Sequence, residues 1–286
     1  MDRVVVIGAT GMLGSAAVRE LARRRLQAVG PTREALDLGR GAIEAGLRAL
    51  GPTAVVNAAA YTDVARAEWA SEREAVERLN RDAPGELAAA CRTLGIPLLH
   101  VSTDFVFDGR KGTPYREDDR AAPLQVYGQS KLDGERRVLE AHDRALIVRT
   151  STLYGPGRGL RRHYVAAILE RARRGEALRL VRLPVSSPSY AIDVARSMID
   201  LLLAGARGVV HVVNAGGCSR IELAREAVRL AGLESQAVVT EIPPSGDPPR
   251  RPAYSVLDTA RLTELTGRRV RGWREALAEY VADPGP

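Results

Sequence analysis

The sequence begins with a β-branched segment that leads directly into a glycine-rich turn. Arg3–Ile7 predicts a strand, Gly8–Gly14 forms the turn, and an apolar-periodic segment from about Met12 to Arg25 predicts a helix. In this context the first glycine permits a tight bend, the second lets a ligand approach the backbone, and the third lets the helix pack closely on the strand. The free N–H groups at the start of the helix attract an anion. We therefore expect a dinucleotide pyrophosphate to be held by Gly8, Thr10, Gly11, Met12, Leu13 and Gly14.

Short strands and helices continue to alternate through the first half of the chain. Strands are predicted at Ala54–Asn57, Pro97–Ser102 and Ala145–Thr150. Helices are predicted within Ser71–Leu94, around Val126–Ala141 and around His163–Gly175. This order is typical of an α/β fold with a Rossmann-type, doubly wound parallel sheet that carries helices on both faces.

The second half of the chain has a different texture. Glycine and proline clusters at Tyr154–Gly159 and Pro243–Pro252 interrupt shorter elements. We expect a dinucleotide-binding Rossmann domain over residues 1–150 and a smaller C-terminal α/β substrate-binding lobe over residues 151–286. The lobe is expected to be partly interleaved with the last elements of the sheet.

Composition excludes several classes of function. With 45% hydrophobic residues among 286, the chain can bury an ordinary core. The net charge of +7 comes from basic residues scattered among acidic ones, so no nucleic-acid partner is expected. No run of about 18 apolar residues and no leader-like segment is evident, so we expect no membrane contact and a cytoplasmic location. Cys91 and Cys218 lack a metal-ligand spacing, and no metal site is expected.

Lysine is rare in this chain, which makes each lysine informative. Of the 42 lysines and arginines, only Lys111 and Lys131 are lysines, which leaves 40 arginines. Tyr127 and Lys131 stand four residues apart at the start of a predicted helix, so both side chains project from one face. Eight tyrosines and two lysines give about 0.06 such pairs by chance. A solvated surface pair is the alternative, but surface cations in this chain are almost always arginine.

A tyrosine and a lysine in this arrangement suit the reduction of a carbonyl. The oxygen needs a proton as hydride reaches the carbon, and a phenol with a pKa of about 10 donates poorly at neutral pH. We expect the ammonium to lower the pKa of the phenol and to bind the nicotinamide ribose.

Ser102, Thr103 and Asp104 end the preceding strand, at the edge of the sheet where ligands bind. A hydroxyl there can bond the substrate carbonyl, although it can also simply cap the strand.

The cofactor is expected to be NADPH, with NADH open as an alternative. The acidic residue that holds the adenosine 2′-hydroxyl of NAD is not evident around Ala28–Thr32, and Arg33 occupies that neighbourhood. A guanidinium there can bind the 2′-phosphate of NADPH. We expect Asp37 and Leu38 to lie against the adenine, and the small residues Ala58, Ala59 and Ala60 to let the dinucleotide pass close to the backbone.

Motifs over nearly the whole length resemble one known family. They are the glycine turn, residues 56–62, residues 101–109, residues 127–131, residues 149–151, residues 154–156 and residues 251–258. The chain resembles the extended short-chain dehydrogenases/reductases and, more narrowly, the dTDP-4-dehydrorhamnose reductase family. This resemblance implies hydride transfer from NADPH to C4 of a nucleotide-linked 4-keto-6-deoxy sugar, with Tyr127 as the proton donor and Thr103 and Lys131 as its catalytic partners.

The resemblance also assigns roles around the catalytic residues. Asn80 matches an asparagine that supports the surroundings of the lysine beside the cofactor, and Ser102 is expected to contact the cofactor. Substrate contacts are implied at Thr62, Val64, Thr103, Asp104, Phe105 and Arg251. The chain departs from the family at Thr152, where tryptophan is usual, and at His163, and both positions are expected around the substrate.

Three alternatives remain at this point. The substrate can be a different nucleotide 4-keto-sugar from a pathway of secondary metabolism, which the departures at Thr152 and His163 favour. The chain can be a non-catalytic, regulatory nucleotide-binding subunit, or an epimerase or dehydratase that retains its dinucleotide. A homodimer is compatible with the sequence.

Overall fold

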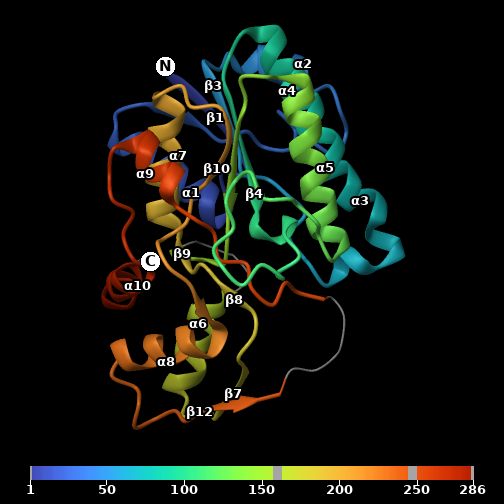
Figure 1. Cartoon of the computed structure of the whole chain (residues 1–286). Coiled ribbons are helices and arrows are strands. Elements are labelled where there is room, and N and C mark those ends of the chain that lie inside the picture. Colours follow the sequence, from blue (N-terminus) through green and yellow to red (C-terminus); the bar gives the residue numbers. More distant parts are fainter. Residues whose placement is uncertain (1, 157–162, 244–249, 285–286) are drawn as a thin grey trace.

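Six parallel strands form the centre of the molecule (Figure 1). The computed structural model describes residues 2–156, 163–243 and 250–284. The strands lie in the order β10-β5-β4-β3-β1-β2. Their bounds are β1 Arg3–Ile7, β2 Gln27–Val29, β3 Ala54–Asn57, β4 Leu98–Thr103, β5 Leu146–Thr150 and β10 Gly208–His211. The inner strands are rich in Val, Ile and Leu, as strands buried on both faces require.

The order of the strands creates a place for a ligand. The chain runs from β1 to β2 on one side and then crosses to β3 on the other side of β1. Ligands of open parallel sheets bind outside the carboxyl ends of the strands at such a switch point. Here that point is occupied by the glycine turn after β1 and by the end of β3 at Asn57.

Helices cover both faces of the sheet. One face packs against α1 (Met12–Arg23), α7 (Ala191–Leu203) and α9 (Ala260–Thr266). The other packs against α2 (Ile43–Leu50), α4 (Ala83–Leu94) and α5 (Val126–Ala141), as Figure 1 shows. The predicted doubly wound α/β fold is therefore confirmed. None of the helices in the described part of the chain is both long and apolar enough to span a membrane.

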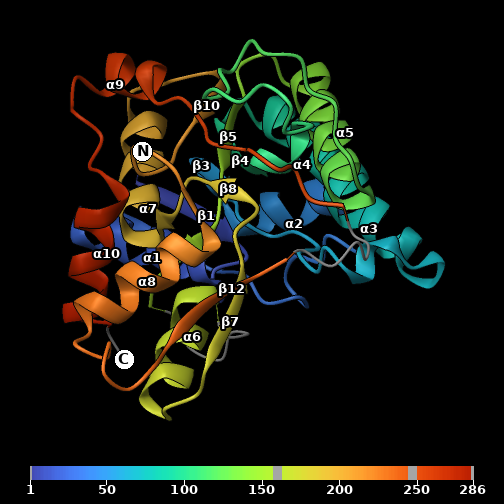
Figure 2. The same ribbon diagram turned by 60° about the horizontal axis from the view of Figure 1, so that its bottom comes forward.

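A second body of structure lies beyond the carboxyl ends of the strands (Figures 1 and 2). Its hydrophobic cluster joins α6 (Tyr164–Arg173), α8 (Arg220–Leu230) and α10 (Trp273–Ala282) with the parallel pair β7 (Leu178–Val181) and β12 (Val239–Ile242). Two short pairs complete it: β6 (Leu153–Tyr154) with β9 (Ser189–Tyr190), and β8 (Val185–Ser186) with β11 (Cys218–Ser219). The chain returns from this region to the sheet through α7 and β10, and the boundary at residue 150 stays a prediction.

The helix predicted within Ser71–Leu94 is interrupted. It consists of α3 (Arg73–Glu77), a π-helical turn η3 (Arg78–Asp82) and α4. Pro84 has no N–H to offer the carbonyl four residues earlier, which is that of Asn80, so the regular helical ladder is broken here. Short 3-10 turns precede it at η1 (Arg66–Glu68) and η2 (Ala70–Glu72), and another, η4 (Asp104–Val106), follows β4.

The backbone of η3 fits tightly against α5, and this contact can be tested. A Cβ added at Gly134 would lie 2.0 Å from the carbonyl oxygen of Asn80. Gly134→Ala should therefore destabilise the protein by about 1–3 kcal/mol, because rigid backbone cannot yield to the added methyl group. Urea unfolding measures the change. Glu140→Ala, at an exposed position of the same helix, is the control, and equal midpoints for the two variants would contradict the prediction.

Candidate active site

A cleft of about 730 Å³ opens at the carboxyl ends of the strands, between the sheet and the second body. It contains most of the residues that the sequence marked for function. Those that line it are Gly8, Thr10, Gly11, Met12, Leu13, Gly14, Ala58, Ala59, Ala60, Thr62, Val64, Ser102, Thr103, Asp104, Phe105, Tyr127, Lys131, Thr152, His163 and Arg251. Residues from widely separated parts of the chain thus meet in one place.

The glycine turn has no room for side chains. Gly8 has a φ of 80°, and a Cβ there would lie 2.8 Å from the backbone nitrogen of Ala59. A Cβ at Gly14 would lie 2.0 Å from the carbonyl oxygen of Gly8. Among the described residues no side chain caps the first turn of α1, so its N–H groups are available to an anion. These features fit the pyrophosphate of a dinucleotide.

Two hydroxyls deeper in the cleft also fit a bound cofactor. Ser102 Oγ and Thr150 Oγ1 are buried and have no hydrogen-bond partner among the described residues. Both residues line the cleft at the ends of β4 and β5. Buried polar atoms are nearly always satisfied, so a polar ligand group is the natural partner here.

Tyr127 and Lys131 lie one turn apart near the start of α5, and both line the cleft together with the glycine turn. Lys131 is only 1% exposed. Its Nζ donates to the carbonyl oxygen of Val101 at 2.7 Å and lies 3.2 Å from Nε2 of His100. Burial lowers the pKa of Lys131 to about 8, and the nearby Glu135 opposes this shift.

The predicted acidification of the phenol is wrong for this structure. Burial raises the pKa of Tyr127 to about 12; the Thr103 hydroxyl opposes the shift and the charge of Asp104 adds to it. The Lys131 ammonium is directed to Val101 and His100 in the middle of β4, and it is not among the groups that shift the pKa of Tyr127. The phenol is therefore fully protonated at neutral pH, which is the form that a proton donor needs.

A buried carboxylate organises the floor of the cleft. Asp104 Oδ2 accepts from Ser151 Oγ at 2.7 Å and from Ser255 Oγ at 2.5 Å, and Oδ1 accepts from Thr103 Oγ1 at 3.2 Å. Burial raises the pKa of Asp104, whereas these hydroxyl donors lower it. The sequence marked Asp104 as a substrate contact. In the structure Asp104 also links β4, the segment after β5 and the C-terminal segment through these hydrogen bonds.

Sequence reasoning missed His100, which is fully buried beneath Lys131. Its Nδ1 lies 3.1 Å from Nδ2 of Asn57, its register partner on β3. Burial and the charge of Lys131 hold the pKa of His100 well below its usual value. A histidine inside a strand gives no local signal of function, so only the fold reveals its contact with Lys131.

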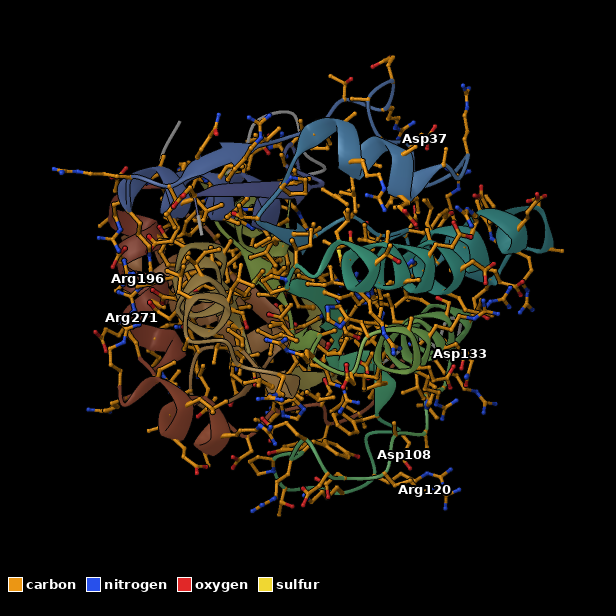
Figure 3. The ribbon with its side chains drawn as sticks, turned by 90° about the horizontal axis from the view of Figure 1, so that it is seen from above. Asp37, Asp108, Arg120, Asp133, Arg196 and Arg271 are labelled. Carbon is orange, nitrogen blue, oxygen red and sulfur yellow. The ribbon has the colours of Figure 1, made fainter. Side chains whose placement is uncertain are left out.

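Four residues predicted to hold the cofactor do not line the cleft. Arg33 is exposed on the loop after β2. Asp37 accepts from the backbone N–H of Gly39 at 2.7 Å and lies at the periphery before α2 (Figure 3). The side chain of Leu38 packs in the core under α2 instead of facing the cleft. Asn80 is fully buried, where it bonds the backbone of Tyr61 and donates to Ser130 Oγ at 3.0 Å.

Two arginines also line the cleft. Arg251 was predicted, whereas Arg220, at the start of α8, was not. The Arg220 guanidinium lies over the ring of Tyr164 at 5.3 Å, and burial followed by the charge of Arg251 lowers its pKa. Burial also lowers the pKa of Arg251, and Asp104 opposes this shift. Neither guanidinium forms an ion pair with a carboxylate in the described ranges, so both are available to an anion.

The two positions that depart from the family motif have partners within the protein. Thr152 has a φ of 27°, which is unusual for a β-branched residue, and its Oγ1 lies 2.7 Å from Ser186 Oγ. His163 Nδ1 accepts from the N–H of Ala166 at 3.3 Å and so caps α6. His163 Nε2 lies 3.2 Å from the hydroxyl of Tyr280. Both residues line the cleft, but both ring nitrogens of His163 already have hydrogen-bond partners.

Comparison with known proteins places the chain in a family. A protein-family model described as the RmlD substrate binding domain matches residues 2–284. The chain belongs to this family. The resemblance inferred from the sequence motifs is therefore confirmed.

Named relatives of the RmlD family match the chain over most of its length. A dTDP-4-dehydrorhamnose reductase from Mycolicibacterium smegmatis is 34% identical over 98% of this chain and 85% of its own. A probable dTDP-4,6-dihydroxy-2-methyloxan-3-one 4-ketoreductase from Streptomyces antibioticus is 38% identical over 98% of this chain and 95% of its own. The crystal structure of a Bacillus anthracis dTDP-4-dehydrorhamnose reductase in complex with NADP has a TM-score of 0.89 and 29% identity, covering 98% of this chain and 99% of that one.

The protonation of Lys131 predicts a pH dependence of dinucleotide binding. Because its pKa is lowered to about 8, Lys131 is cationic below that pH and neutral above it. If the ammonium binds the cofactor, NADPH affinity should fall by up to about tenfold per pH unit above 8, as measured by NADPH fluorescence titration. Lys131→Met carries no charge at any pH, so it should bind NADPH more weakly and without this dependence between pH 7 and 9. An unchanged dependence in that variant would rule out Lys131 as its source.

Proposed function

We propose that this protein reduces the C4 carbonyl of a nucleotide-linked 4-keto-6-deoxy sugar with NADPH, as a dTDP-4-dehydrorhamnose reductase of dTDP-L-rhamnose synthesis. The observation that carries the proposal is the meeting of Thr103, Tyr127 and Lys131 with the glycine turn in one cleft. The named relatives and the NADP complex support it.

We assign a separate role in the reaction to each group of residues in the cleft. NADPH supplies the hydride, and the glycine turn and the backbone at Ala58–Ala60 are proposed to hold its pyrophosphate. Tyr127 donates the proton to the substrate oxygen, and the Thr103 hydroxyl turns its hydrogen from Asp104 to the same oxygen when substrate binds. Lys131 binds the ribose and restores the proton of Tyr127. Exposed Arg33 is proposed to meet the 2′-phosphate at the outer end of the site.

The two arginines support a nucleotide diphosphate as the anionic part of the substrate. Arg220 and Arg251 both line the cleft, and burial lowers the pKa of each. Neither guanidinium is paired with a carboxylate in the described structure. A diphosphate can accept several hydrogen bonds from two guanidinium groups. This arrangement also argues against a subunit that binds only the cofactor.

A second candidate is a different nucleotide 4-keto-sugar. Thr152 replaces the tryptophan usual in the family, and it lines the cleft with an uncommon backbone conformation. The Streptomyces antibioticus relative is described as acting on another dTDP-linked ketone. Rates with dTDP-linked 4-ketones that differ in configuration and methylation would separate the two candidates.

Replacing the proposed proton donor tests the reaction. Tyr127→Phe should retain NADPH affinity but lower kcat by about two to four powers of ten, because proton donation in the transition state is lost. NADPH oxidation with dTDP-4-dehydrorhamnose measures the rate. Tyr61→Phe is the matched control, since the Tyr61 hydroxyl bonds Glu72 at 2.9 Å, outside the cleft. A Tyr127→Phe enzyme with nearly full turnover would remove the assignment.

Replacing Arg220 tests whether this guanidinium binds the diphosphate of the substrate. Arg220→Gln should weaken binding of dTDP by roughly tenfold or more, since a hydrogen bond to a charged group contributes about 1.5–3 kcal/mol. Isothermal titration calorimetry with dTDP measures this directly. Arg225→Gln, at an exposed position of the same helix, should leave the affinity unchanged. Equal effects of the two substitutions would show that Arg220 has no special contact.

A further inference from the structure

The side chains beneath Lys131 fix where hydrogens lie. The backbone N–H of Ala59 donates to Oδ1 of Asn57 at 3.1 Å, which orients the amide. The amide nitrogen Nδ2 therefore faces Nδ1 of His100, 3.1 Å away. An amide nitrogen only donates, so Nδ1 of His100 must accept. The neutral imidazole then carries its proton on Nε2.

The proton on Nε2 points at the catalytic lysine. Nε2 of His100 lies 3.2 Å from Nζ of Lys131. An uncharged amine has a lone pair that accepts this N–H, whereas an ammonium has three donors and no lone pair. We propose that Asn57 and His100 form a tautomer lock that favours the uncharged amine of Lys131, which makes His100 a positioning residue for proton return to Tyr127.

Burial keeps this arrangement intact. Asn57 and His100 are 0% exposed, so water cannot replace either partner. To accept from an ammonium, His100 would have to move its proton to Nδ1, where it would oppose the Asn57 amide hydrogens. Rotating the amide would in turn break the bond from Ala59. Each way of accommodating the ammonium therefore costs a buried hydrogen bond.

The charged groups near Lys131 are themselves held by other partners, so they do not prevent Lys131 from becoming uncharged. Glu135, one turn further along α5, favours the ammonium, but Arg149 holds its carboxylate at 2.7 Å. Asp104 of η4 lines the same cleft and is held by three hydroxyls. From η3 the uncharged Asn80 faces α5 through Ser130. Burial lowers the pKa of Lys131 although the charge of Glu135 raises it. This net shift has the same direction as the effect that we propose for the lock.

The catalytic consequence rests on the proposed reduction. Once Tyr127 has given its proton to the substrate oxygen, the phenolate must regain one. When the Lys131 ammonium supplies that proton, one N–H bond breaks, one O–H bond forms, and both groups become neutral. The lone pair left on Nζ accepts the N–H of His100. Solvent then recharges the amine, so the lock stabilises the lysine in the state that follows each turnover.

The tautomer itself can be observed in the full chain. The protein has four histidines, and a His100→Phe variant assigns the signals of His100 in nitrogen-15 NMR spectra of histidine-labelled protein. We expect Nδ1 to be unprotonated and Nε2 to carry the proton. A proton found on Nδ1 of His100 would overturn the proposal.

The effect on Lys131 is tested by Asn57→Asp, a substitution that hardly changes the size of the side chain. Asn57→Asp keeps an acceptor for the N–H of Ala59 but presents an acceptor to His100, so the proton should move to Nδ1 and Nε2 should accept from the ammonium. With only two lysines, carbon-13 labelled lysine gives two side-chain titrations, and Lys111→Arg assigns them. The pKa of Lys131 should rise by about one unit or more.

A control separates the lock from simple charge. Asn57→Asp in the His100→Phe background measures the effect of the added carboxylate without the imidazole. The rise in the Lys131 pKa should be clearly smaller there. A rise in the wild-type background that is no larger than in this background would overturn the proposal. Because no readout depends on turnover, failure of the proposed reaction would appear separately, as absent NADPH oxidation.

Discussion

The approach of backbone to backbone at the start of the sheet is the constraint on which the cleft depends. Gly14 brings α1 so near to the turn that a Cβ would lie 2.0 Å from the carbonyl oxygen of Gly8. Gly8 in turn contacts the backbone at Ala58 and Ala59, after β3. These contacts place the uncapped start of α1 at the switch point between β1 and β3. Larger side chains would push the helix away and close the path for a dinucleotide.

The protonation states of Tyr127 and Lys131 depend on their burial rather than on their spacing along α5. The phenol of Tyr127 and the amine of Lys131 are both shifted toward their neutral forms, because burial penalises charge. A neutral phenol is ready to give a proton, and a lysine with a pKa of about 8 exchanges its own proton near neutral pH. Asp104 is held by hydroxyls from three segments, and its charge acts on the pKa of both Tyr127 and Arg251.

Local patterns predicted much of this from sequence. The bounds of α5 agree with the predicted Val126–Ala141, and the glycine turn and Tyr127 line one cleft at the carboxyl ends of the strands, where a ligand was expected. What was missed depends on contacts between distant segments. His100 meets Asn57 across 43 positions, and Ser255 meets Asp104 across 151. The direction of the phenol's pKa was also wrong, because spacing along a helix shows which groups are neighbours but not how much water they lose.

The two lysines illustrate why one position cannot be arginine in a chain that has 40 of them. Lys111 lies at the surface, where it bonds Asp119 and the carbonyl oxygen of Pro114, and a guanidinium would serve equally well there. Lys131 is 1% exposed, and its Nζ fits between the Val101 carbonyl and the His100 ring. A guanidinium is planar, broad and always charged, so it can neither occupy that space nor give up a proton. The site therefore requires a small cation that can become neutral.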